Sequence, residues 1–123
     1  MRTVLRTKIH RAWVTDADPG HVGSILIDED LMDKIDLRNF EKVLVCDLTS
    51  GNRFETGVIA GERGSGVCSV QGAAARLSSK GNCLVIMSFE TTDEPIGPKM
   101  ILVDEQNRFV EYLEGAKNVQ QVH

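Results

Sequence analysis

The chain contains 123 residues, a length that suits one compact domain and at which a small barrel often gains stability by forming oligomers. Its 18 acidic and 14 basic residues give a formal net charge of -4 and are mixed along the chain, which argues against nucleic-acid and membrane partners. The sequence shows neither an apolar leader nor a run of transmembrane length, so we expect a cytoplasmic protein.

The first half of the chain alternates between strand patterns and turn residues. Its first strand pattern is rich in β-branched and basic side chains, and two later ones flank a Ser-Gly-Asn turn typical of a hairpin. In chain order, the predicted elements are a strand at 3–14, a turn at 16–20, a short strand from 24, a helix at 29–35, and strands at 43–48 and 53–59.

The second half continues with short elements. The glycine-rich segment 61–66 predicts a flexible turn rather than a phosphate-binding loop, because neither Lys-Ser nor Lys-Thr follows it. Residues 72–77 predict one or two helical turns, 83–89 a buried strand, 100–103 a last core strand, and the polar residues after about 112 a loose tail. The pattern predicts a mainly-β single domain over residues 1–123, a closed or nearly closed β-barrel with two short helices.

The three cysteines, Cys46, Cys68 and Cys83, are an odd number without C-x-x-C spacing. Each lies in an apolar, strand-like run. This pattern predicts reduced, buried thiols rather than a metal or redox site.

The pair Gly23–Ser24 lies between a turn and a strand and is the first candidate for chemistry. Glycine permits backbone conformations closed to other residues, so the Ser24 hydroxyl can attack the Gly23 carbonyl and form an ester. Elimination would free the Gly23 carboxylate and leave dehydroalanine, which hydrolyses to a pyruvoyl group with loss of ammonia. Gly-Ser is also common in ordinary turns, and by itself the dipeptide favours that interpretation.

Several sequence blocks in one register support the cleavage interpretation. They are residues 2–11, 14–15, 17–18, 22–24, 27–28, 30–33, 52–54, Thr56, 61–66 and 72–76. In order and spacing these blocks resemble the aspartate 1-decarboxylases. The resemblance implies a double-psi β-barrel, a homotetramer with sites between subunits, and self-cleavage into segments 1–23 and 24–123. It also implies conversion of L-aspartate to β-alanine and CO₂ for pantothenate synthesis.

The cofactor implied by the resemblance is a pyruvoyl group derived from Ser24, with neither a metal nor pyridoxal phosphate. Loss of CO₂ leaves an electron pair on carbon, and no unmodified side chain offers a ketone to accept it. A pyruvoyl ketone, joined to the substrate amine as a Schiff base, would do so. A helper protein for maturation is a further partner to consider.

The resemblance also assigns substrate-binding residues. Arg53 suits bidentate binding of a carboxylate, and Lys8 supplies a point charge, although composition alone would place both on solvated strands. Backbone N–H groups near small residues can also approach a carboxylate, although the same residues could simply pack against the barrel. The remaining members of the substrate-binding set are Gln71, Gly72, Ala73 and Ala74.

Two further residues are expected to take part in catalysis beside Gly23 and Ser24. Thr56 resembles the family threonine that assists cleavage near the Gly23 carbonyl; otherwise it is a half-buried strand residue. His10 lies two residues from Lys8, so both would share one strand face. It is either a proton relay or a structural histidine.

The chain departs from the family pattern near the expected pocket. Gly57 replaces the usual tyrosine that protonates the substrate carbon, and the single tyrosine, Tyr112, lies far along the chain. Water, His10, His21 or Thr56 would then have to donate the proton, and we select His21 as the candidate proton donor. Gln71 replaces an asparagine, His21 replaces a tyrosine, and Cys46 replaces a tryptophan of some relatives.

These departures keep other functions open. A pyruvoyl decarboxylase with a different amino-acid substrate is the second hypothesis. A barrel that never cleaves and binds a small acid or a protein is the third. A DNA-binding regulator is the fourth, and the acidic balance disfavours it.

Overall fold

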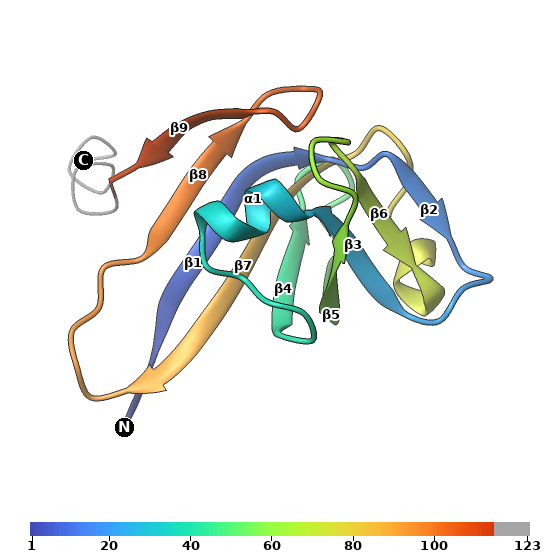
Figure 1. Ribbon diagram of the computed structural model, residues 1–123. Helices are drawn as coiled ribbons and strands as arrows, with labels where there is room; N and C mark the ends of the chain where they lie inside the picture. Colours follow the sequence, from blue (N-terminus) through green and yellow to red (C-terminus); the bar gives the residue numbers. More distant parts are fainter. Residues whose placement is uncertain (115–123) are drawn as a thin grey trace.

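The computed structural model describes residues 1–114, which form one nine-stranded sheet with two short helical segments (Figure 1). The elements are β1 (Arg2–Trp13), β2 (Asp16–Asp18), β3 (Ser24–Asp28), α1 (Glu29–Lys34), β4 (Lys42–Asp47), β5 (Arg53–Gly61), β6 (Cys68–Gln71), the 3-10 helix η1 (Gly72–Arg76), β7 (Cys83–Thr92), β8 (Lys99–Val103) and β9 (Phe109–Leu113).

Strands that are consecutive in the chain are not always neighbours in the sheet. Its hydrogen-bonded order is β2-β6-β3-β5-β4-β7-β1-β8-β9. Strands β1 and β2 follow each other directly in the chain, yet five other strands lie between them in the sheet order. The chain bends between β1 and β2 (Figure 1). The fold is therefore mainly β, as predicted, and it is consistent with a double-psi barrel.

The core is formed by apolar residues that recur at every second position along the strands. Ile9, Ile25, Val43, Val58 and Ile86 are all at most 1% exposed. Burial of each such side chain stabilises the fold by about 1.5–3 kcal/mol. Successive strand residues point to opposite faces, so the sequence neighbours of these five residues point away from the core.

Asp28 connects the helix to the glycine-rich turn. It caps α1 by accepting a hydrogen bond from the Asp30 N–H, and it also accepts bonds from the N–H groups of Gly64 and Gly66, at 3.0 and 2.9 Å. The predicted turn at 61–66 is thus fastened to the start of α1 by one carboxylate. Within residues 1–114, no helix is long and apolar enough to cross a membrane.

Most predicted elements are present, and two differ. Residues 16–18, expected as part of a turn, form β2 because they pair in parallel with β6. After the predicted last core strand, β8, the structure contains one more strand, β9, which pairs with β8 although Val110, Glu111 and Tyr112 are exposed. The predicted loose tail lies largely outside the described residues.

Candidate active site

The Gly23–Ser24 pair lies at the entry to β3, where neighbouring strands meet it. Ser24 is 9% exposed and pairs with Gln71 of β6. On the other side, Ile25 pairs in parallel with Val58 of β5. Continuing that register backwards places Ser24 beside Gly57 and Gly23 beside Thr56. The structure therefore brings Ser24 together with Gln71, and the continued register places Thr56 on the neighbouring strand.

Gly72 packs its backbone directly against Gly23. It has a φ of +78°, and a Cβ atom at this position would lie 2.4 Å from the Gly23 Cα and 2.7 Å from the Gly23 nitrogen. Both facts demand glycine, because other residues disfavour this conformation and no side chain fits. Ala73 and Ala74 follow in η1, so their backbone starts next to the cleavage site.

A row of residues crosses five strands on the face that points away from the core. Asp18 pairs with Gln71, Gln71 pairs with Ser24, and Gly57 pairs with Lys42. We call Asp18, Gln71, Ser24, Gly57 and Lys42 the cross-strand row. Open space lies above its glycine, since a Cβ atom on Gly57 would meet nothing within 4 Å.

His21 lies at one end of the cross-strand row. Its Nε2 atom is 3.0 Å from an Oδ2 of Asp18, and the two side chains are 62% and 41% exposed. The His21 carbonyl oxygen also lies close to Gly72. The structure therefore holds this predicted proton-donor candidate near Ser24, through a carboxylate that sequence reasoning did not select.

Lys8, His10 and Arg53 share the outer face but not the same place on it. Lys8 lies in β1 opposite Met87, and His10 lies opposite Val85, whereas Arg53 lies in β5. Two strands separate β1 from β5, so these cations stand about 14 Å apart measured along the sheet. Lys8 is one strand farther still from Ser24. Within one chain, the predicted substrate-binding cations do not meet at the cleavage site.

The environment of His10 keeps its imidazole neutral more readily than usual. Burial lowers the pKa of His10 below its ordinary value, and the nearby charges of Lys8 and Arg11 lower it further. A neutral imidazole can accept a proton or a hydrogen bond at physiological pH. This state is compatible with both expected roles of His10, the proton relay and the structural histidine.

Asp47 anchors the segment that leaves η1, and sequence reasoning did not single it out. Its carboxylate accepts hydrogen bonds from the N–H groups of Thr49 and Ser50, the Ser78 hydroxyl and the Asn82 amide, at 2.7 to 2.9 Å. Burial alone would raise the pKa of Asp47, but these hydrogen bonds outweigh it and lower the pKa overall. An aspartate two residues before Thr-Ser-Gly is a recognisable turn signal. The hydrogen bonds to Ser78 and Asn82, which lie far along the chain, cannot be recognised from the sequence.

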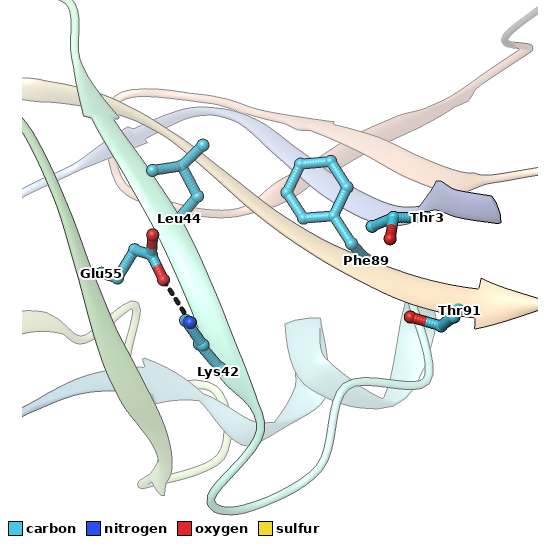
Figure 2. A pocket seen from close by; sticks show the side chains of 6 residues that line it. All are labelled: Thr3, Lys42, Leu44, Glu55, Phe89 and Thr91. Carbon is cyan, nitrogen blue, oxygen red and sulfur yellow. Dashed lines mark ion pairs between the residues drawn. The ribbon is translucent and has the colours of Figure 1, made fainter. Parts of the chain in front are cut away.

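Lys42 and Glu55 form a second feature that was not predicted. Their side chains pair at 2.6 Å on the outer face of β4 and β5. Figure 2 shows this ion pair beside a cavity of about 360 Å³, which Leu44, Phe89 and two threonines help to line. Lys42 is also the cross-strand partner of Gly57 and thus belongs to the cross-strand row.

The fold and the site together define a small, mainly-β protein with a largely buried serine preceded by glycine at the entry of a strand. The family model described as aspartate decarboxylase matches residues 1–110. The chain belongs to this aspartate decarboxylase family.

Relatives named aspartate 1-decarboxylase support the assignment. The Acetivibrio thermocellus protein is 49% identical over 112 residues, which cover 88% of this chain and 89% of that protein. A Clostridium botulinum protein is 50% identical, with 85% and 86% covered. The Pseudothermotoga lettingae protein is 47% identical, with 89% and 97% covered.

Proposed function

We propose that this chain cleaves itself between Gly23 and Ser24 and that the product decarboxylates L-aspartate to β-alanine and CO₂. The observation that carries the proposal is the close-packed backbone at Gly23, which Gly72 contacts and Ser24 follows into β3. This arrangement fixes the scissile peptide against the sheet. Family membership supplies the reaction class.

In the cleavage step, the Ser24 hydroxyl oxygen bonds to the Gly23 carbonyl carbon, and the peptide C–N bond breaks to leave an ester. Loss of the Gly23 carboxylate from that ester gives dehydroalanine, which takes up water and releases ammonia to become the pyruvoyl group. Thr56, which lies beside Gly23 if the β3–β5 register is continued, would hydrogen-bond the developing oxyanion.

The surrounding residues fit such a group. Gly57 leaves open space beside residue 24, and the required glycine at 72 lets the backbone approach closely. When formed, the pyruvoyl ketone supplies the electron acceptor for decarboxylation. Gln71 lies next to residue 24 and can orient a carboxylate, as can the N–H groups at Ala73 and Ala74.

The outer face is the natural place for a second copy of the chain. Lys8, His10 and Arg53 point to this face, yet Lys8 lies four strands from Ser24 in its own chain. A homotetramer with sites between subunits would let Lys8 of one copy serve Ser24 of another. We further propose a cytoplasmic enzyme of pantothenate synthesis, whose maturation a helper protein assists.

Denaturing intact-mass spectrometry tests the proposal, with the non-cleaving variant Ser24→Ala as control. The wild-type chain should give a fragment ending at Gly23 and a larger fragment that gains a hydrazine label at its ketone. The purified protein should then form β-alanine from L-aspartate. A single full-length mass that survives heating would contradict the proposal and favour the barrel that binds without cleaving.

The open space above Gly57 supports one second candidate, a decarboxylase for a different, bulkier amino acid. The longer amide at Gln71 would reshape the same pocket. A panel of amino acids read by CO₂ release separates the two substrates. Release from another amino acid, with none from L-aspartate, would favour this second function.

A further inference from the structure

The proposed reaction ends only when a proton reaches the substrate carbon that has lost CO₂. The donor must reach the face to which Ser24 points, because a substrate joined to residue 24 lies there. Ionisable members of the cross-strand row lie on both sides of Ser24. On one side is Asp18, whose carboxylate pairs with His21, and on the other side is Lys42. The geometry of the row distinguishes these two sides.

The path from Lys42 to residue 24 is open. Only Gly57 lies between them, and it has no side chain and open space above its Cα atom. Two strand spacings separate Lys42 from Ser24, about 10 Å between Cα atoms. A substrate of a few carbons bridges this gap together with the long lysine side chain. On the opposite side, the half-buried Gln71 separates Asp18 from Ser24.

The Lys42 side chain is 76% exposed and is directed towards Glu55 of β5. Its ammonium pairs with Glu55 at 2.6 Å, while Leu44 and Phe89 line the adjoining cavity (Figure 2). The Glu55 carboxylate would repel a substrate carboxylate brought to the same ammonium. The pair is therefore poorly suited to binding the substrate carboxylate. Sequence reasoning did not consider this residue, because an exposed strand lysine is ordinarily a solvated one.

We propose that Lys42 is the proton donor of the decarboxylation, with Glu55 as its positioning residue; this inference rests on the proposed function. The electron pair left by CO₂ forms the new C–H bond with a proton from the Lys42 Nζ atom. The resulting amine regains its proton from water while Glu55 keeps it in place. Gly57 provides the passage between the two strands.

The test measures two quantities, the rate of β-alanine formation and the fraction of 24–123 fragments that keep the ketone. If the proton reaches the carbon of residue 24 instead, hydrolysis leaves an amine in place of the ketone on the 24–123 fragment and releases an aldehyde. That fragment then no longer takes the hydrazine label. Cleaved wild-type, K42M, K42R and H21Q proteins are incubated with L-aspartate, and both fragments are measured by intact mass.

We expect K42M to cleave normally, to form β-alanine about 10²-fold more slowly, and to lose the hydrazine-reactive terminus about tenfold more often per turnover. K42R should behave like K42M, because arginine keeps the charge but does not release its proton in proteins. Lys80, in the turn after η1, provides the matched control K80M.

Four results would overturn the assignment. Wild-type behaviour of K42M would exclude Lys42, and wild-type behaviour of K42R alone would show that only the charge matters. Loss of the reactive terminus in H21Q but not in K42M would assign the proton to His21. A wild-type chain that never cleaves would contradict the proposed function itself, and Lys42 with it.

Discussion

Asp47 shows how one buried carboxylate stabilises several segments at the scale of a residue. Its pKa is lowered in the folded protein, so its contribution to stability is complete above the unfolded-state value of about 3.9 and is lost as the pH falls through the folded value. We expect Asp47→Asn to lower the free energy of unfolding at pH 7 by about 1–3 kcal/mol. Urea unfolding at pH 7 and pH 3 measures this, and the variant should lose less between the two.

Asp104→Asn is the control for this prediction. Among residues 1–114, the Asp104 side chain accepts hydrogen bonds only from the N–H groups of Gln106 and Arg108, both through one oxygen, which an asparagine keeps. Its substitution should therefore change stability little. Equal losses in both variants, or an unchanged acid dependence in Asp47→Asn, would contradict the role of the side-chain partners.

The cysteines differ in reactivity for a reason visible only in the structure. Burial raises the pKa of Cys68 to about 12 and raises that of Cys83 as well, so neither forms the reactive thiolate readily. Cys46 is half-buried on the outer face. With iodoacetamide at pH 8, native protein should be labelled first at Cys46, and peptide mass mapping would show it. Labelling of Cys68 at a similar rate would be the contrary result.

At the scale of an element, η1 depends on the glycine that begins it. Gly72→Ala would place a methyl group 2.4 Å from the Gly23 Cα, in a conformation that costs non-glycine residues about 1–3 kcal/mol. Cleavage at Ser24 should slow or stop, and intact mass over time measures the rate. Gly97→Ala is the matched control, because a Cβ atom there meets nothing within 4 Å and should leave cleavage unchanged. Normal cleavage by Gly72→Ala would mean that this contact does not align the scissile peptide.

Local patterns identify elements well where they coincide with packing. The alternating residues of β1 and the Ser-Gly-Asn turn before β5 predict strands that the structure contains. Strand β2 escapes such prediction because it has only 3 residues and forms by pairing with β6, which lies far along the chain. Strand β9 escapes it because Val110, Glu111 and Tyr112 are all exposed and give no alternation of buried and exposed residues. Likewise Gly23, Ser24 and Gln71 are candidates because of the family resemblance, whereas Lys42 and Asp18 become candidates only through the register between strands.

At the scale of the whole molecule, the separation of Lys8 from Ser24 predicts complementation between chains. Co-expressed Lys8→Ala and Ser24→Ala chains, mixed at random, should regain activity in about a quarter of the sites if Lys8 serves another subunit, and in none if it serves its own. The matched control mixes wild type with the double variant. That mixture should give about a quarter of the sites between subunits, but about half within one. β-Alanine formation per pyruvoyl terminus in both mixtures therefore decides between the two arrangements, because only sites between subunits make them equal.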